Sequence, residues 1–350
     1  MSHHVAAGPR VAVVGVTGAV GKEMVRVLAD RAFPLSDLRL FASARSAGKT
    51  CQTAYGTKTV EAFSVDAAAE CDIVLLAVSG DFAQQHAPRL AARGVVVIDN
   101  SSAFRYDEGT PLVVPEINPS AVIDSQIIAN PNCTTAILSV ALWPLHQAFG
   151  LKRVMVSTYQ AASGAGAEGM AELEEQARAW LDTGKAGHSV FAHPLPFNLI
   201  PHIDAFQDNG YTREEMKVTW ETRKILGLAD LPVSCTSVRI PTMRAHAETV
   251  VVETEKPVDP VVARDVMAAA PGVVVVDDPR ERRYPMPLTA SGRYDVEVGR
   301  IRQSLAFGSH GLEFFLCGDQ LLKGAALNAV QIAEELVRQR GDALQPKAWA

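Results

Sequence analysis

The residue with the clearest chemical potential is Cys133, in the stretch NPNCTT at 130–135. An apolar run at 127–129 predicts a short strand before it, and the apolar run at 137–145 predicts a helix after it. Asn132 is a preferred N-cap type, and a helix N-terminus lowers a cysteine pKa by one or more units from about 8.5, giving a thiolate near neutral pH. The alternative is a small buried residue, and the stretch alone leaves the two interpretations evenly matched.

A glycine turn follows the first buried strand, predicted at 10–14. Gly15, Gly18 and Gly21 have the spacing G-x-x-G-x-x-G and run into a helix that extends through about Ala29. Glycines at such a turn let the backbone approach a pyrophosphate that lies on the helix N-terminus. The spacing differs from G-x-G-x-x-G, but its place in the first βα turn favours a dinucleotide site over a plain tight turn.

The loop after the second strand, which is predicted at 38–42, indicates which dinucleotide the site would bind. A site for NAD usually carries Asp or Glu here to hold the ribose 2′-hydroxyl. Ser43, Arg45 and Ser46 offer hydroxyls and a guanidinium instead, which suit a 2′-phosphate. The loop therefore predicts NADP, and the alternative is a solvated basic loop.

Further strands at 72–78 and 95–98 alternate with a helix at 82–93. Open parallel sheets bind ligands beyond the carboxyl ends of their strands, so Ser79, Gly80 and residues 100–102 are predicted to line the cofactor crevice. Arg105 follows a few residues later, and it is either a surface charge or an anion ligand.

Past Cys133, a strand at 154–160 runs into the small-residue loop 161–166, which could let a flat ring or a phosphate approach the backbone. A polar helix is predicted at 168–181 and an ordered irregular loop at 193–202. Thr212 and Glu215 form a capping box that opens another helix. On that helix Glu214 and Lys217 are spaced i, i+3, which from spacing alone predicts a surface salt bridge.

The remaining sequence predicts mainly antiparallel strands, at 233–240, 248–253, 273–276, 296–302 and 312–317, with one helix near 260–270. Arg239 at a strand end and His246 in a loop are candidates for chemistry. An amphipathic helix from about 320 to 338 contains Asn328. The prediction is an α/β protein with a Rossmann-type dinucleotide-binding domain at 1–132, completed by the C-terminal helix 328–350, and an α+β catalytic and dimerisation domain at 133–327.

Composition bounds the class of protein. With 350 residues and 48% hydrophobic content, the chain can bury two domain cores. A formal net charge of −6 gives no overall attraction to nucleic acid or to an anionic membrane. No apolar run reaches the roughly 18 residues of a membrane span and residues 1–4 lack a signal-peptide pattern, so we expect a soluble cytoplasmic protein. Five widely spaced cysteines without a C-x-x-C pair argue against a disulfide framework and a structural metal site.

Taken together, these motifs resemble aspartate-semialdehyde dehydrogenase, along nearly the full length from Val11 to Glu335. The strongest matches are GVTGAVG at 15–21, NPNCTT at 130–135, YQAASG at 159–164, FNLIPH at 197–202 and KGAALNAV at 323–330. One departure is Asp319-Gln320, where the family pattern has Asp-Asn. It touches no predicted catalytic role, so the activity expected from the resemblance is unchanged.

The resemblance implies roles residue by residue. Cys133 is the implied nucleophile and His246 the implied acid/base. The substrate contacts it implies are Gln160, Arg239 and, for the substrate amine, Glu214, which overturns the surface interpretation of the Glu214–Lys217 pair. Phosphate would be held by Arg105 and Lys217, and the cofactor by Gly15, Thr17, Gly18, Ala19, Val20, Ser43, Arg45, Ser46, Ser163, Gly164 and Asn328.

The implied reaction is the reversible, phosphate-dependent reduction of L-aspartyl 4-phosphate to L-aspartate 4-semialdehyde with NADP, through a cysteine thioester. Its product feeds lysine (through diaminopimelate), methionine and threonine synthesis, and the resemblance implies a homodimer, or two dimers paired into a tetramer. The nearest alternative is N-acetylglutamyl-phosphate reductase, a family whose sequence at the nucleophile resembles Asn-Pro-Gly-Cys. In this chain Asn132, not glycine, precedes Cys133, which favours aspartate as the substrate. A dinucleotide-binding protein without catalysis would need no reactive thiol.

Overall fold

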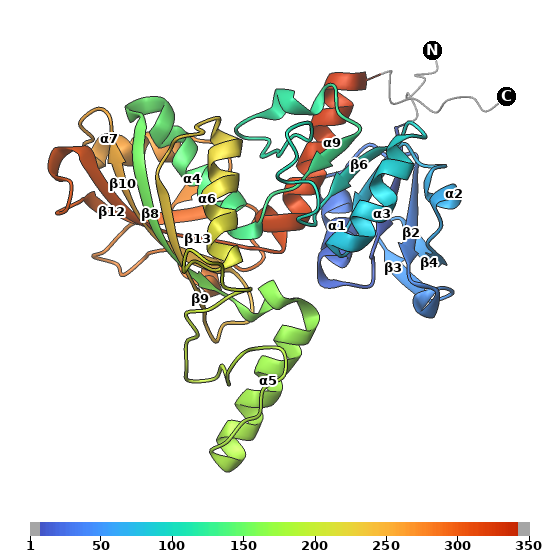
Figure 1. The fold of residues 1–350 in the computed structure, drawn as a ribbon, viewed down its shortest axis with the longest axis horizontal. Coiled ribbons are helices and arrows are strands. Elements are labelled where there is room, and N and C mark those ends of the chain that lie inside the picture. Colours follow the sequence, from blue (N-terminus) through green and yellow to red (C-terminus); the bar gives the residue numbers. More distant parts are fainter. Residues whose placement is uncertain (1–7, 342–350) are drawn as a thin grey trace. The chain divides into compact units, whose positions relative to one another are not determined.

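The computed structural model describes residues 8–341, which divide into two compact units. Unit 1 comprises residues 8–131 and 325–341, and unit 2 comprises residues 132–324 (Figure 1). Residues 1–7 and 342–350, which the sequence assigned to the first domain and its C-terminal helix, lie outside the described residues. Each unit contains its own sheet, and within residues 8–341 every helix is too short or too polar to cross a membrane.

Unit 1 is built on a seven-stranded sheet with the order β3-β4-β2-β1-β5-β6-β7. All neighbouring strands pair in parallel except β3, which is antiparallel to β4. From β1 the chain builds the sheet first through β2 and then, on the other side, through β5, so ligands of such a sheet bind beyond the carboxyl end of β1. The elements are β1 (Arg10–Val14), α1 (Ala19–Asp30), β2 (Asp37–Ala42), the 3₁₀ turn η1 (Ala44–Ser46), β3 (Thr50–Thr53), β4 (Gly56–Ala62), α2 (Val65–Ala68), β5 (Ile73–Leu76), α3 (Gly80–Ala91), β6 (Val96–Asp99), η2 (Pro119–Val122), β7 (Ile127–Ala129) and α9 (Leu327–Arg340).

Both faces of this sheet are covered, as a parallel sheet requires. On one face, Val14, Val74 and Leu76 share a fully apolar core with α2 and α3. Alternate residues such as Val13 and Leu75 are equally buried on the opposite face. Helices α1 and α9 lie side by side, joined by two hydrogen bonds of 2.7 Å from the Arg31 guanidinium to the Glu334 carboxylate. The last helix therefore completes unit 1, although it is separated from α1 by some 300 residues.

Unit 2 contains a mixed six-stranded sheet with the order β11-β12-β13-β10-β8-β9. Strands β8 and β9 are parallel, β10 is antiparallel to both β8 and β13, and β11 and β12 are parallel. Its elements are α4 (Cys133–Phe149), β8 (Leu151–Gln160), the 3₁₀ turn η3 (Ala162–Ala165), α5 (Gly166–Thr183), α6 (Arg213–Leu226), β9 (Val233–Arg239), β10 (His246–Thr254), α7 (Pro260–Ala268), β11 (Val273–Val275), α8 (Pro287–Ala290), β12 (Val296–Gln303), η4 (Gly308–His310), β13 (Gly311–Gly318) and the π-helical turn η5 (Leu322–Ala326).

Helix α4 is the centre of unit 2. Most of its side chains from Thr134 to Leu145 are buried, and it contacts the sheet at β8, β10, β12 and β13 and the neighbouring helices α6 and α7. A helix that is apolar on all sides needs such complete cover, which explains its low amphipathicity. Helix α5 projects away from the sheet of unit 2 (Figure 1), and the chain returns along it as the loop that leads to α6.

The predicted fold class, a Rossmann-type domain with an α+β domain, is confirmed. The second sheet is mainly antiparallel, as predicted, although two of its five strand pairs are parallel. Two local expectations were wrong. The final helix does not begin at Gln320, because η5 at Leu322–Ala326 precedes α9. His246 is not in a loop: it is the first residue of β10 and is fully buried.

Candidate active site

Cys133 is the first residue of α4, as the sequence predicted. Asn132 is the N-cap, and its Oδ1 accepts hydrogen bonds from the backbone N–H of Thr134 at 3.0 Å and of Thr135 at 3.3 Å. The Cys133 thiol is half-buried, with Sγ 4.0 Å from the hydroxyl oxygen of Thr134. The capped N-terminus places the positive end of the helix dipole at the sulfur, which favours its thiolate form.

Asn132 also ties Cys133 to α6. Its Nδ2 donates to Glu214 Oε1 at 2.9 Å, and its backbone N–H donates to Glu221 Oε2 at 2.6 Å. Glu214 and Glu221 are seven residues apart, so they lie on the same face of α6 two turns apart. The loop that carries the cysteine is therefore held by two buried carboxylates on one helix face.

Glu214 is the centre of a buried polar cluster. Its Oε1 also accepts from Gln160 Nε2 at 3.2 Å, and its Oε2 pairs with Lys217 Nζ at 3.0 Å. Lys217 pairs in turn with Asp204 Oδ2 at 2.7 Å. Burial acts to raise the pKa of Glu214, but Lys217 and the hydrogen bonds from Asn132 and Gln160 outweigh it and hold that pKa below its ordinary value.

The surface salt bridge predicted from the i, i+3 spacing is therefore wrong for this pair. The Glu214 side chain is 7% exposed and that of Lys217 is 14% exposed. The spacing alone did not reveal burial, because an i, i+3 pair forms equally on an exposed and on a buried helix face. The capping box is confirmed: Thr212 Oγ1 accepts from Glu215 N, and Glu215 Oε2 accepts from Thr212 N.

His246 and Arg239 are both organised by the main chain of Ala161. The Ala161 N–H donates to His246 Nδ1 at 3.0 Å, and the Ala161 carbonyl accepts from Arg239 Nη1 at 2.6 Å. Burial lowers the pKa of His246 well below its usual value, and the nearby charge of Arg239 adds to this effect. The ring is therefore neutral at physiological pH.

Arg239 is buried at the end of β9, with its guanidinium 5.9 Å from the centre of the Phe191 ring. Burial lowers the pKa of Arg239, and the charges of Glu214 and Cys133 oppose that effect, which places all three groups within electrostatic reach of one another. Only one of the five guanidinium N–H donors is used within the described part of the chain. The remaining donors form a planar fork that suits a carboxylate.

Five of the residues predicted for the cofactor lie in the glycine-rich segment 15–21 of unit 1. Gly15 has φ +87°, and a Cβ there would lie 2.2 Å from the carbonyl oxygen of Ala77, so only glycine fits. Gly18 is the N-cap of α1 and has no side chain to bond the first N–H groups, while Thr17 and Gly18 are exposed. An exposed helix N-terminus without a side-chain cap fits an anion such as a pyrophosphate.

The loop at 43–46 lies beside this turn, because the Gly15 N–H donates to Phe41 O at 2.8 Å at the end of β2. Ser43 and Arg45 are exposed, whereas the Ser46 side chain is buried. The guanidinium of Arg45 thus stands in solvent at the carboxyl end of β2. That position fits a group on the ribose of a bound dinucleotide.

The structure places the other predicted residues in tighter surroundings. Arg105, in unit 1, is buried and donates to Asn130 O at 2.9 Å and to Asn100 O at 2.8 Å. Asn328 is fully buried in α9, and its Nδ2 donates to Val113 O and to Asn130 Oδ1. Ser163 is buried in η3. Their roles toward phosphate and cofactor stay predictions.

The departure at Gln320 lies beside a predicted cofactor residue. Its Oε1 accepts from the Ala245 N–H at 2.8 Å, and its Nε2 donates to the Ser163 hydroxyl. Gln320 thus contacts a predicted cofactor residue and the residue before His246, although no role was predicted for it. Asp204 and Ala161 were also missed. Asp204 lies thirteen residues from its partner Lys217, and Ala161 acts through backbone atoms that its residue type does not reveal.

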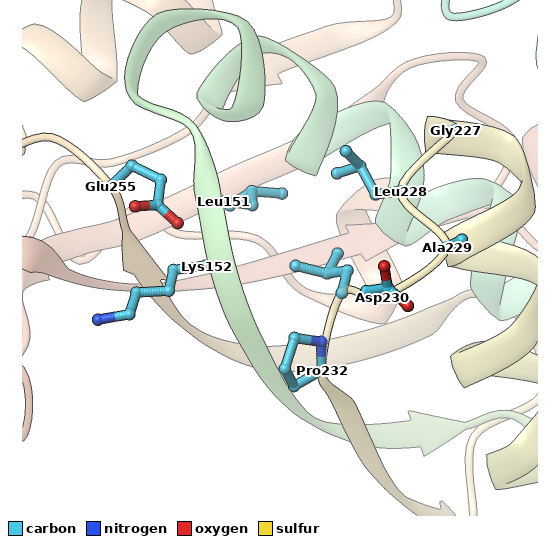
Figure 2. A pocket seen from close by; sticks show the side chains of 9 residues that line it. Leu151, Lys152, Gly227, Leu228, Ala229, Asp230, Pro232 and Glu255 are labelled. Carbon is cyan, nitrogen blue, oxygen red and sulfur yellow. The ribbon is translucent and has the colours of Figure 1, made fainter.

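A hollow of about 480 Å³ in unit 2 lies elsewhere (Figure 2). It is lined by the start of β8, by residues 227–232 after α6 and by Glu255, and none of the predicted site residues lines it. The site residues Gln160 and Glu214 lie at the opposite ends of β8 and α6. This hollow is therefore separate from the candidate active site.

A parallel-sheet unit with a glycine turn, together with a unit that holds a capped cysteine, a neutral histidine and a buried arginine, is the arrangement expected of a dehydrogenase with a dinucleotide-binding domain. Two family models match: "Semialdehyde dehydrogenase, NAD binding domain" at residues 10–125, and "Semialdehyde dehydrogenase, dimerisation domain" at residues 142–323. The chain is 48% identical to the aspartate-semialdehyde dehydrogenase of Synechocystis sp. over 331 residues, which cover 94% of this chain and 98% of that protein. It is also 48% identical to that of Aquifex aeolicus, with coverage of 95% and 99%.

Among solved structures, the chain is similar to aspartate semialdehyde dehydrogenase II of Vibrio cholerae complexed with ASA. The TM-score is 0.91 at 42% identity, and the match covers 95% of this chain and 98% of that one. The chain belongs to the aspartate-semialdehyde dehydrogenase family. It is an oxidoreductase with a Rossmann-like domain for a nicotinamide dinucleotide.

Proposed function

We propose that this chain catalyses the reversible, phosphate-dependent reduction of L-aspartyl 4-phosphate to L-aspartate 4-semialdehyde with NADP, for lysine, methionine and threonine synthesis. The observation that carries the proposal is the buried cluster around Cys133. Gln160, Glu214, Arg239 and His246 all lie in the same unit as the thiol, and hydrogen bonds connect them to its loop or to the turn at Ala161.

The thiolate of Cys133 is the nucleophile in this proposal. It attacks the acyl carbon of the aspartyl phosphate and displaces phosphate, which leaves a thioester. A nicotinamide cofactor, when bound, supplies the hydride that reduces this thioester. The glycine turn of unit 1 fits its pyrophosphate, and Ser43, Arg45 or Ser46 would hold a 2′-phosphate.

The residues around the thiol suit an amino acid substrate. The open N–H fork of Arg239 fits the α-carboxylate. Glu214 is ionised, and its two oxygens accept three contacts out of about four lone-pair positions, which leaves room for an ammonium donor. A free amine is what distinguishes aspartate from an N-acetylated substrate, so the buried charge of Glu214 favours aspartate over N-acetylglutamate.

Phosphate is assigned to two cations. Lys217 makes two ion pairs within the described residues, which leaves one of its three ammonium donors for an anion. Arg105 in unit 1 is the second proposed ligand. In this proposal the protein is a cytoplasmic homodimer. Half-exposed apolar side chains such as Met155, Tyr159 and Phe315 alternate with buried ones along β8 and β13, and such a surface suits contact with a partner subunit. Pairing of dimers into a tetramer stays a prediction.

The test is NADP reduction with aspartate semialdehyde and, in parallel, with N-acetylglutamate semialdehyde, each with and without inorganic phosphate. Phosphate-dependent turnover with the aspartate compound alone supports the proposal. Preference for the N-acetylated compound would assign the alternative reductase. Dinucleotide binding without turnover of either compound would indicate a binding protein.

A further inference from the structure

Helix α5 leaves the sheet of unit 2, and the chain returns along it (Figure 1). Residues 189–200, here called the return segment, lie on this path. None of the predicted site residues lies in α5 or in the return segment. The segment nevertheless reaches the substrate site, because the buried Phe191 ring has its centre 5.9 Å from the Arg239 guanidinium. The groups that hold Phe191 in place therefore bear on how Arg239 is presented.

Glu172 on α5 anchors the start of the return segment. Its carboxylate accepts hydrogen bonds from three successive backbone N–H groups, those of Ser189 at 3.1 Å, Val190 at 2.6 Å and Phe191 at 3.3 Å. The Ser189 hydroxyl donates to it as well. Burial acts to raise the pKa of Glu172, but these hydrogen bonds outweigh it and hold that pKa below its ordinary value. The anchor is therefore an ionised carboxylate, a group that only accepts.

Gln176 lies one turn further along α5 and anchors the middle of the return segment. Its Oε1 accepts from the Leu195 N–H at 2.9 Å, and its Nε2 donates to Glu172 Oε1 at 2.8 Å. Both anchoring side chains are buried. The two are thus bonded to each other and to backbone groups of the return segment, which fixes that segment against one face of α5.

The end of the return segment is paired with Arg239 itself. The Ile200 N–H donates to Arg239 O at 2.9 Å, and the Arg239 N–H donates to Ile200 O at 2.8 Å. The segment therefore meets the same arginine twice, through the Phe191 ring at its start and through the main chain at its end. A displacement of the segment would act on both the guanidinium and the backbone of Arg239.

Apolar packing joins the return segment to α5 and to the turn after β8. One buried cluster contains Ala162, Leu173, Phe191, Leu195 and Ile200. Gly169 on α5 is close to this cluster: a Cβ there would lie 2.6 Å from Ala162 O and 3.2 Å from Cζ of the Phe191 ring. The ring is therefore confined between the helix and Arg239, with little room to turn away.

We propose that Glu172 and Phe191 are positioning residues that hold the Arg239 guanidinium for the α-carboxylate of the substrate. An aromatic ring attracts a cation through its face and leaves the N–H donors of the guanidinium for a carboxylate. The Ala161 carbonyl holds Nη1 at 2.6 Å, and Phe191 supplies the second contact that sets the orientation of the group. The inference rests on the proposed function for the role of Arg239 and deepens it.

The anchor is tested with Glu172→Gln, which keeps the size of the side chain. Each carboxylate oxygen of Glu172 faces only N–H or O–H donors among the described residues. Whichever way the amide is turned, its NH₂ group points at donors and cannot accept from them. The variant should therefore release the start of the return segment and loosen Phe191.

The first measurement compares kcat/KM for aspartate semialdehyde with that for 3-aminopropanal, which is the same aldehyde without the carboxylate. Both are assayed with NADP and phosphate. Glu172→Gln should narrow the wild-type preference for the carboxylate compound by about tenfold, because a misplaced Arg239 loses only the contact that the second compound never makes. A merely structural defect lowers both values in parallel, so an unchanged ratio would overturn the proposal.

Two further variants separate the ring from the anchor. Phe191→Leu keeps an apolar side chain and removes the aromatic face, and it should narrow the same ratio by at least about threefold. Glu174→Gln is the matched control, since Glu174 lies on the same helix with its side chain 57% exposed. The control should keep the wild-type ratio. A ratio that falls equally in Glu174→Gln and Glu172→Gln would count against a specific anchor.

The last measurement needs no substrate. Amide hydrogen exchange in the full-length protein should be at least about tenfold faster at residues 189–191 in Glu172→Gln than in the wild type, and unchanged in Glu174→Gln. Unchanged exchange in Glu172→Gln would show that the carboxylate holds nothing. The two levels of inference fail differently: a wild type that turns over neither aldehyde removes the proposed function, whereas an active wild type whose preference survives in Glu172→Gln removes only the positioning role.

Discussion

The buried ion pair of Lys217 offers a sharp test of the active-site geometry. Lys217→Met keeps the length of the side chain and removes its charge. Glu214 is then left ionised with 7% of its side chain exposed, whereas Asp204, at 33%, can regain water. Breaking a buried pair by removing one partner costs about 3–5 kcal/mol. Because Asp204 regains water, we expect Lys217→Met to lower the free energy of unfolding by about 3 kcal/mol, at the lower end of that range. For a unit of this size, such a loss lowers Tm by roughly 6–12 °C.

The chain provides a matched control. Lys152 pairs with Glu253 at 2.9 Å, a distance like that of the Lys217 pairs, but the Lys152 side chain is 48% exposed. Lys152→Met should change the free energy of unfolding by less than about 0.5 kcal/mol. Urea titration of both variants measures the difference. If Lys217→Met lowers the free energy of unfolding by no more than Lys152→Met does, the Glu214–Lys217 pair is screened by solvent and the buried cluster is not as described.

A double variant isolates the cause. Lys217→Met with Glu214→Gln removes the stranded charge while leaving a carbonyl oxygen that accepts from Asn132. It should be more stable than Lys217→Met alone by at least about 1 kcal/mol, since residues in contact couple by roughly 0.5–3 kcal/mol. In the kinetic assay, Lys217→Met should raise KM for phosphate far more than KM for the semialdehyde.

Three further outcomes are expected. We expect the wild type to prefer NADP over NAD by at least about tenfold in kcat/KM. Arg45→Ala should reduce this ratio, mainly by lowering kcat/KM for NADP, and an unchanged ratio would count against a role for Arg45. Of the five cysteines, Cys133 should be alkylated fastest at pH 7, as read by labelling and peptide mass analysis, because burial raises the pKa of a competitor such as Cys71 to about 12. Cys133→Ala should abolish turnover. Burial raises the pKa of Glu248 well above its unfolded value of about 4.3, so the stability from this group is fully present below that pH and is lost as the pH rises from there through the folded-state pKa, by at most about 1.4 kcal/mol per pH unit. In urea titrations from pH 4 upward, Glu248→Gln should remove this loss of stability.

The parts of the fold that the sequence predicted well are those set by local interactions. The N-cap at Asn132 and the capping box at Thr212 each involve residues no more than three apart, so their residue types suffice to place two helix starts. The glycine turn after β1 is similar, because Gly15 adopts φ +87°, a backbone conformation that favours glycine. Burial was not predictable in this way: the Glu214–Lys217 pair depends on how α6 packs, and its spacing is the same on any helix.

The role of Ala161 could not be predicted from its residue type. Its functional atoms are the N–H and the carbonyl, which every residue but proline supplies. The position of His246 was missed for a related reason. The strand was predicted to start at Glu248, whereas β10 starts at His246 and both side chains are buried.

The sheet topology of unit 2 explains why these residues meet. Gln160 and Arg239 end two parallel strands that pair in register, so both side chains lie at one edge of the sheet. A parallel pair requires a long crossover, and here that crossover carries α6 with Glu214 and Lys217. Because β10 is antiparallel to β8, its first residue, His246, lies at the same edge. Two strand ends, one strand start and one crossover helix therefore converge, and the Ala161 peptide, which follows β8 directly, is the backbone segment within reach of both Arg239 and His246.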